Sequence, residues 1–215
     1  MLKVLQVINS LSSGGAEVFV TQLVNALSSQ CEVKLLSYAG ELDQKGVSLK
    51  EYLKQNDVQY ISLNANSEFK RLSAPLRIAS VIDEWKPDSV HVHMIRSEQF
   101  EFLSSLVSRH KYKARRTKHD ERIYPAFVMN RFMHRFYSRN IACSDSAFRA
   151  LASMGLADRS VIIKNGIELG LIKKLGDEEK LEMKKRLGIP VDKTLLLNIG
   201  SMQLERTGFQ KSQDL

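Results

Sequence analysis

The spacing of apolar residues changes at a pair of glycines near the N-terminus. Residues 3–8, KVLQVI, are a short run of mainly aliphatic side chains, which is typical of a buried strand in a parallel sheet. After a Ser/Gly turn, apolar side chains recur at the spacing i, i+3, i+4 and i+7, which places them on one face of a helix. These side chains belong to Val20, Leu23, Val24 and Leu27. The pattern predicts a strand, a turn and then a helix.

The same alternation of strands and helices continues along most of the chain. Further strands are expected at 32–38, 58–63, 89–94 and 140–144. Further helices are expected at 47–55, 75–85 and 97–108, with another that opens at Ser144 or Asp145. Short connections in such an alternation predict an α/β fold, with a doubly wound, mostly parallel sheet that binds ligands at the carboxyl ends of its strands.

A change of composition in the last quarter of the chain predicts a domain boundary. Residues 171–187 are highly charged and helical in pattern, whereas 193–201 look like the first strand of a new unit. Only about twenty residues remain from the start of that strand, which is too few to bury a second core. We therefore expect a main domain at 1–170, a helical linker at 171–192 and the start of an incomplete second domain at 193–215.

The composition is that of a soluble globular protein. Hydrophobic residues make up 43% of the chain and charged residues 26%. No window approaches the roughly 18 apolar residues that a membrane-spanning helix needs. The N-terminal residues lack the charged region and cleavage site of a secretory signal, so a cytoplasmic location is expected.

The charge balance indicates an anionic partner. The formal net charge is +8, which suits nucleic acid, an anionic lipid surface or a phosphorylated small molecule. Cys31 and Cys143 lie far apart without metal-ligand spacing, so neither a disulfide framework nor a zinc site is expected.

The turn at Gly14 and Gly15 has two interpretations. Backbone N–H groups at the start of a helix, without side chains in the way, are a natural seat for phosphate. The stretch is neither the GxGxxG of dinucleotide binders nor a P-loop, which ends in Lys-Ser/Thr. A tight turn between strand and helix explains the same residues equally well.

Histidines lie on one of the expected strands and at the end of another. His91 and His93 are two residues apart on a strand and therefore share a face, either as core residues or with His93 nearer a ligand at the strand end. No third ligand is evident, so no metal is expected. His119 and Asp120 end another expected strand, where a histidine beside an acid serves as a hydrogen-bond donor, an acid/base group or part of a turn.

Basic and aromatic residues alternate in 127–139, FVMNRFMHRFYSR. Rings and cations on one helix suit an anionic membrane surface, and the residues expected to contact it are Arg131, Phe132, Arg135 and Phe136. A core helix with a solvated basic edge is the alternative. No nucleic-acid-binding motif accompanies the stretch, so nucleic acid is not the expected partner.

Five stretches in order resemble the N-terminal domain of the family 4 retaining glycosyltransferases, which have the two-domain GT-B fold. They are KVLQVINSLSSGGAEVFVTQL, KPDSVHVHM, RTKHDE, NIACSDSAFRALASMG and SVIIKNGIE. The resemblance covers most of the chain, and it implies a Rossmann-like acceptor-side domain followed by an incomplete donor-binding domain. It also implies that a nucleotide sugar is a substrate and that neither a cofactor nor a metal is needed.

The resemblance assigns roles on the donor side of the interdomain cleft. Gly14 and Gly15 would lie against the donor diphosphate and the acceptor, with Glu17 near the loop. His119 would be the catalytic residue, in contact with the donor sugar or the charge that develops on it. Basic groups of the cleft would stabilise the leaving diphosphate in place of a metal.

The acceptor side of the cleft would be formed by other residues of the matching motifs. The resemblance implies that His93 and Asp120 line this side, and that Asn165 and Gly166 shape the cleft near the hinge between domains. All four residues lie within the expected domain at 1–170.

The chain departs from the family pattern near its C-terminus. The family places the diphosphate-binding Arg and Lys, and an acidic pair for the donor, in its C-terminal domain. Here Ser201 stands where the family often has Arg, Arg206 and Lys211 are the candidate substitute cations, and the acidic pair is absent. The chain alone is therefore expected to show little or no transferase activity.

The resemblance implies transfer of a sugar from a nucleotide-sugar donor to a lipid-linked or saccharide acceptor, in the synthesis of surface polysaccharide or lipopolysaccharide. One alternative is a non-catalytic half-enzyme that binds a partner protein or a membrane. In the second case it would be a peripheral protein at the inner face of the membrane. A second alternative is a fragment of a nucleotide-sugar epimerase, which shares the two-domain architecture.

Overall fold

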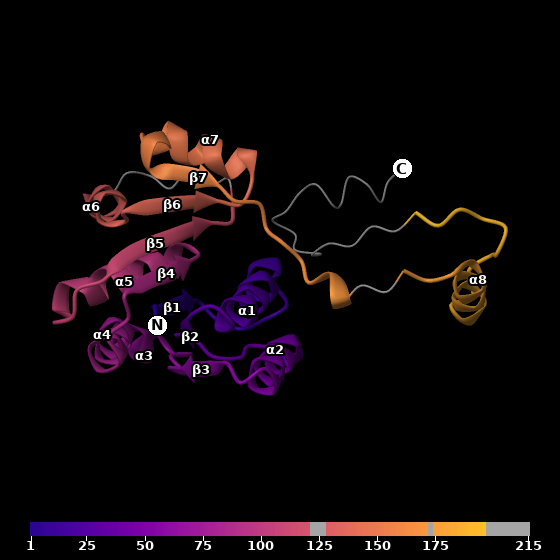
Figure 1. The fold of residues 1–215 in the computed structure, drawn as a ribbon, viewed down its shortest axis with the longest axis horizontal. Helices are drawn as coiled ribbons and strands as arrows, with labels where there is room; N and C mark the ends of the chain where they lie inside the picture. The colour runs from indigo at the N-terminus through magenta and orange to yellow at the C-terminus, as the bar shows by residue number, and fades with distance from the viewer. Residues whose placement is uncertain (121–127, 172–173, 197–215) are drawn as a thin grey trace. The chain divides into compact units, whose positions relative to one another are not determined.

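The computed structural model describes residues 1–120, 128–171 and 174–196, and these fall into two compact units (Figure 1). The first unit spans Met1–Glu168 and carries the sheet, and the second spans Leu169–Leu215. In the described part of the second unit, a short 3-10 helix (η2, Leu169–Leu171) and one α-helix (α8, Asp177–Arg186) are formed. A strand is expected at 193–201. Its described residues, 193–196, belong to no strand, and residues 197–201 lie outside the described part of the chain.

The first unit is built on a parallel sheet, with seven strands among the described residues. The strands are β1 (Lys3–Ile8), β2 (Glu32–Ser37), β3 (Gln59–Ser62), β4 (Ser89–His93), β5 (Lys113–Lys118), β6 (Arg139–Ala142) and β7 (Ser160–Ile162). Their order across the sheet is β3-β2-β1-β4-β5-β6-β7, and each neighbouring pair is parallel. The expected α/β, doubly wound parallel fold is confirmed, and β7 is a strand that the apolar pattern did not predict.

Helices follow the strands as the apolar periodicity predicts. They are α1 (Gly15–Ser28), α2 (Gln44–Gln55), α3 (Glu68–Leu72), α4 (Ala74–Trp85), α5 (Ile95–Val107), α6 (Val128–Phe136) and α7 (Asp145–Ser153), and the 3-10 helix η1 (Ala157–Arg159) precedes β7. Three of these α-helix starts are capped by side chains that accept a backbone N–H: Asp43 from Gly46, Ser67 from Lys70 and Ser144 from Ala147. Ser144 is thus the N-cap and Asp145 the first residue of α7.

Alternate residues of the strands pack against different helices. On one face, Ile8 and Leu35 pack with α1 and α2. On the other face, Leu5, Val7 and Val92 pack with α4 and α6 in a core that α5 also borders. The order of the strands reverses its direction between β1 and β4, and in such sheets ligands bind in the crevice at this reversal.

Candidate functional site at the carboxyl ends of the central strands

The glycine turn connects β1 to α1. Gly14 is the N-cap of α1 and has an extended conformation that any residue adopts, so a positive φ does not explain the glycine. A Cβ at position 14 would instead collide with the carboxylate of Glu17, which is buried, whereas a Cβ at Gly15 would meet nothing within 4 Å. Gly14 therefore makes room for Glu17, while Gly15 leaves the first turn of α1 uncovered.

Glu17 changes the expected electrostatics of this turn. Its carboxylate accepts a hydrogen bond from Ser12 Oγ at 3.2 Å and lies against Gly14, at the positive end of the α1 dipole. A negative side chain already occupies part of the place expected for phosphate. An anionic ligand at this turn would therefore have to bind beyond Gly15, on the side away from Glu17.

Asp43 holds the same turn from a neighbouring loop. Its Oδ2 accepts hydrogen bonds from Ser13 N at 2.9 Å and Ser13 Oγ at 2.6 Å, while its Oδ1 accepts one from Gly46 N at 2.8 Å. These hydrogen bonds lower the pKa of Asp43, with Ser13 Oγ as the largest contributor. The turn is thereby tied to the N-terminus of α2.

Buried polar side chains meet where β1, β4 and β5 lie side by side. His93 Nε2 is 2.7 Å from Gln6 Oε1, and His93 Nδ1 is 3.0 Å from His119 Nε2. His91 Nε2 is 2.7 Å from Thr117 Oγ1. We call these five residues, Gln6, His91, His93, Thr117 and His119, the histidine cluster.

Burial keeps the three histidines neutral. Desolvation lowers the pKa of His91 to about 3, with further lowering by His119 and Arg115, and lowers the pKa of His93 well below its usual value. Desolvation also lowers the pKa of His119 to about 4, although the nearby Asp120 carboxylate acts in the opposite direction. At neutral pH the cluster therefore offers neutral imidazoles to a ligand.

The structure separates the expected roles of His93 and His119. The side chain of His93 is 0% exposed, so it does not itself reach the surface that was expected to be the acceptor side of a cleft. His119 is partly exposed, follows β5, and packs against Phe19 of α1 with ring centroids 5.7 Å apart. Of these two residues, His119 is the one that meets solvent, and His93 lies behind it.

Other expected site residues lie at the surface. Asp120 is exposed and accepts a hydrogen bond at 2.7 Å from the buried Lys118. Asn165 and Gly166 are exposed beyond β7, and a Cβ at Gly166 would meet nothing within 4 Å. Arg206 and Lys211 lie outside the described residues.

Asn9 joins the end of β1 to the start of α5, close to the reversal of strand order. Its Oδ1 accepts hydrogen bonds from Ser97 N at 3.0 Å and Ser97 Oγ at 2.7 Å, which connects the end of β1 to the first turn of α5. The sequence interpretation missed Asn9, Gln6 and Thr117. The available clue was Gln6, a lone polar side chain within the aliphatic run of the first strand.

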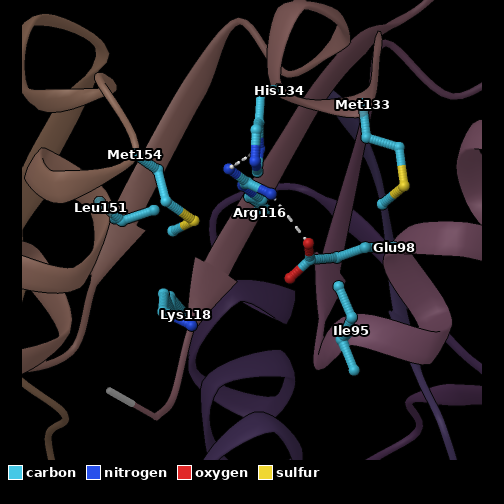
Figure 2. A pocket seen from close by; sticks show the side chains of 8 residues that line it. All are labelled: Ile95, Glu98, Arg116, Lys118, Met133, His134, Leu151 and Met154. Carbon is cyan, nitrogen blue, oxygen red and sulfur yellow. Dashed lines mark hydrogen bonds and ion pairs between the residues drawn. The ribbon is translucent and has the colours of Figure 1, made fainter. Parts of the chain in front are cut away.

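A second polar cluster lies on the opposite face of β5 (Figure 2). Arg116 donates hydrogen bonds to Glu98 Oε2 at 2.9 Å and His134 Nδ1 at 3.0 Å, which Figure 2 shows. It also donates to Asn140 Oδ1 at 2.6 Å. We call these four residues the arginine cluster. Because Arg116 donates to His134 Nδ1, that imidazole is neutral, and burial and the Arg116 charge lower its pKa to about 4.

A small pocket opens beside the arginine cluster. It is lined by Ile95, Glu98, Arg116, Lys118, Met133, His134, Leu151 and Met154, which come from α5, β5, α6 and α7 and from the turn after α7 (Figure 2). The three guanidinium nitrogens of Arg116 are already hydrogen-bonded within the protein. These bonds use three of the five guanidinium N–H donors, and Arg116 is only 3% exposed, so the pocket gives an anionic ligand little access to its charge.

Glu101 is a buried carboxyl group next to the arginine cluster. It accepts hydrogen bonds from Tyr112 Oη and Tyr137 Oη, each at 2.7 Å. Desolvation nevertheless raises its pKa to about 8, because the two phenols offset only part of the cost of burying the charge. Glu101 is therefore mostly protonated at neutral pH.

The helix expected to contact a membrane presents only part of the predicted surface. Phe132 is 58% exposed and Arg135 is exposed. Phe136, in contrast, is half-buried and packs against Phe102 and Tyr137, with ring centroids 5.5 and 5.2 Å away, so its contact with lipid stays a prediction. The side chain of Arg131 lies outside what the structure describes.

Among the described residues, no three His, Cys, Asp or Glu side chains are placed so that they could hold a metal ion. In the same part of the chain, no helix combines the length and the apolar character needed to cross a bilayer.

A doubly wound sheet with a glycine turn and a histidine cluster at its strand reversal defines a ligand-binding domain of the Rossmann-like class. The model of Glycosyltransferase Family 4 matches residues 13–171. The chain therefore belongs to this family, as the five motifs predicted.

Solved structures share the fold at low sequence identity. Anabaena HepE in complex with UDP and glucose is 18% identical, with a TM-score of 0.69 over 87% of this chain and 50% of its own. The lipopolysaccharide outer core galactosyltransferase WaaB is 12% identical, with a TM-score of 0.60 over 78% and 47%. The UDP-N-acetylglucosamine 2-epimerase of Rickettsia bellii is 15% identical, with a TM-score of 0.57 over 88% and 52%.

The chain spans about half the length of each of these three proteins. No curated protein matches it significantly.

Proposed function

We propose that this chain provides the acceptor-side half of a glycosyltransferase that moves a sugar from a nucleotide-sugar donor to a saccharide or lipid-linked acceptor. Membership of Glycosyltransferase Family 4 supports the reaction class. The UDP and glucose in the HepE complex support the donor, and the likeness to WaaB supports a place in lipopolysaccharide or surface polysaccharide synthesis.

The observation that carries the proposal is the position and state of His119. It is a neutral imidazole held between the end of β4, through His93, and α1, through Phe19. Hydrogen bonding from such a group can orient a sugar without adding a charge to the site. We assign His119 to contact the donor sugar at its reacting end.

The glycine turn is assigned to the diphosphate of the donor. Gly15 supplies uncovered backbone at the start of α1, where N–H groups attract a negative ligand. Glu17 holds the turn through its hydrogen bond from Ser12 Oγ, and its carboxylate repels phosphate from the Gly14 side. The diphosphate would therefore lie along Gly15 rather than over both glycines.

The acceptor side is assigned to exposed groups around the same strand ends. Asp120 and the segment at Asn165 and Gly166 are accessible to a saccharide, whereas His93 supports His119 from behind. A lipid-linked acceptor would additionally bring the protein to the cytoplasmic face of a membrane.

Ligand binding to the isolated chain tests this function. We would titrate ¹⁵N-labelled protein with nucleotide sugars, and separately with saccharide and lipid-linked acceptors, and follow the NMR signals of the Gly15 amide and the His119 ring. His119→Ala should weaken binding. His110→Ala is the matched control, because His110 contacts the Pro87 carbonyl before β4 and β5 begin, at the amino ends of the strands.

Two results would count against the proposal. One is the absence of any shift at Gly15 and His119 with millimolar ligands. The other is equal weakening of binding by His119→Ala and His110→Ala. Turnover is a separate measurement, and we expect little or none from this chain, because it spans half the length of the transferases that share its fold.

A membrane-binding half-enzyme is the second candidate function, favoured by the exposed ring of Phe132 next to the exposed Arg135. Flotation with vesicles that contain anionic lipid should fall with added salt and with Phe132→Ser. Phe69→Ser is the control, since that ring is 87% exposed on a different helix. Equal loss from both variants would reject α6 as the membrane contact.

An epimerase fragment is the remaining alternative, because the Rickettsia bellii epimerase shares the fold. An epimerase needs no acceptor. Incubation with UDP-N-acetylglucosamine alone, followed by separation of the sugar epimers, distinguishes the two enzymes. Conversion of the sugar without an acceptor would favour the epimerase over the transferase.

A further inference from the structure

We infer that Gln6 and His93 act as positioning residues that fix the tautomer of His119, so that His119 carries its proton on Nε2 and presents an unprotonated Nδ1 to a ligand. The tautomer follows from the hydrogen bonds within the protein. Only the identity of the ligand rests on the proposed function, in which a sugar hydroxyl is the group that donates to Nδ1.

The first step concerns Gln6. It lies on β1, is 1% exposed, and its Oε1 faces His93 Nε2 at 2.7 Å. An amide oxygen only accepts hydrogen bonds, so the proton between these two atoms belongs to His93 Nε2.

The second step passes through His93. A neutral imidazole has one N–H, so protonation at Nε2 leaves Nδ1 as an acceptor. The partner of Nδ1 is His119 Nε2 at 3.0 Å, which must therefore donate. Complete burial of His93 beside two other histidines opposes the doubly protonated form, in which this direction would be lost.

The third step concerns His119, the partly exposed end of the hydrogen-bond series Gln6–His93–His119. With its proton on Nε2, neutral His119 retains Nδ1 as an acceptor, and no residue of the described structure donates a hydrogen bond to that atom. An acceptor nitrogen selects a ligand group that can donate. A hydroxyl satisfies this requirement, whereas an ionised phosphate oxygen does not, so His119 is a hydroxyl contact rather than a diphosphate contact.

Histidine NMR tests the inference on the chain itself, without any ligand. Two-bond ¹H–¹⁵N correlation spectra distinguish the Nε2–H form, the Nδ1–H form and the charged form of each imidazole. In the wild-type protein at pH 7, we expect both His93 and His119 in the Nε2–H form. Finding the proton of His119 on Nδ1 would overturn the inference.

A pair of variants tests whether Gln6 is the cause. Gln6→Met keeps the length of the side chain but removes the acceptor, so the His93 and His119 ¹⁵N signals should move toward a mixture of tautomers. Thr117→Val is the matched control, since it removes the partner of His91 on the same face of the sheet but removes no atom of the Gln6–His93 and His93–His119 hydrogen bonds. No change in Gln6→Met, or an equal change in Thr117→Val, would overturn the role of Gln6.

The proposed function fails or survives independently of this result. If the wild-type tautomer is as inferred but no hydroxyl-bearing sugar binds, the function is rejected and the role of Gln6 stands. If sugars bind but His119 carries its proton on Nδ1, the function stands and the inference is rejected.

Discussion

The two faces of β5 carry polar clusters that respond to burial in opposite ways. On the face toward α1, the histidine cluster loses its charges, since each imidazole can release a proton. On the other face, Arg116 cannot do so, and Glu98, Asn140 and His134 surround it with acceptors. A neutral cluster can leave one polar atom for a ligand, whereas Arg116 is 3% exposed and each of its three guanidinium nitrogens bonds within the protein.

The comparison favours the histidine cluster as the candidate site. Both clusters are built around β5, and both contain titratable side chains. The histidine cluster ends at a partly exposed ring beside the strand reversal, whereas the arginine cluster lies beside a pocket but keeps Arg116 buried among its own partners. The availability of a hydrogen-bonding atom, more than the density of charge, marks the candidate site.

Acid should have the largest effect, mainly through the histidine face, which carries three histidines of lowered pKa, whereas the arginine face carries one, His134. A histidine with a lowered folded pKa contributes stability that is present above its unfolded value near 6.5 and is lost as the pH falls toward 4. We therefore expect the free energy of unfolding to drop between pH 6.5 and 4 in urea titrations. Asp43 and Asp83 change the stability only below about pH 4, because their folded pKa values are lowered from an ordinary value of 3.8. A folded-state titration of His119 near pH 6.5 would contradict this prediction.

Glu98→Gln should break the arginine face alone. Removing one partner of a buried ion pair leaves the Arg116 charge uncompensated, which costs about 3–5 kcal/mol of stability. Glu68→Gln is the control, because Glu68 is 98% exposed in its pair with Arg71, and such surface pairs contribute about 0–1 kcal/mol. Denaturant unfolding of both variants measures the difference, and equal effects would show that Arg116 does not depend on Glu98.

Glu101→Gln should sharpen the comparison of the two faces. A carboxyl group whose folded pKa is raised contributes stability below its unfolded value of 4.5 and loses it as the pH rises through about 8. The variant should therefore show a smaller loss of stability from pH 6 to 8 and a larger one from pH 6.5 to 4.5. Unfolding midpoints at these pH values test it, and unchanged slopes would show that Glu101 is already ionised in the folded protein.

The smallest effect is expected at the glycine turn. Gly15→Ala meets open space at the first residue of α1 and should raise stability by about 0.4–1 kcal/mol, while its methyl group obstructs the approach of a ligand to the backbone. Gly14→Ala must displace the Glu17 carboxylate and should lower stability. Thermal unfolding and nucleotide-sugar binding of the two variants measure these effects. A stabilised Gly14→Ala protein would show that Glu17 moves aside without cost.

The fold was largely predictable because strand and helix periodicities are local properties of the sequence. The partners within the histidine cluster were not, since Gln6 and His93 are 87 residues apart and only strand order brings β1 beside β4. The packing of Phe136 was not predictable for a related reason. Periodicity shows that α6 is amphipathic, but only the packing of Phe102 and Tyr137 shows which rings face inward.

The double use of Asp43 has a consequence for how the molecule opens locally. One oxygen caps α2 through Gly46 N, and the other accepts from Ser13 N in the glycine turn. Breaking either contact frees the same side chain, so fraying of α2 and loosening of the turn form one cooperative unit. The amide protons of Ser13 and Gly46, 33 residues apart in sequence, should therefore exchange with solvent at linked rates.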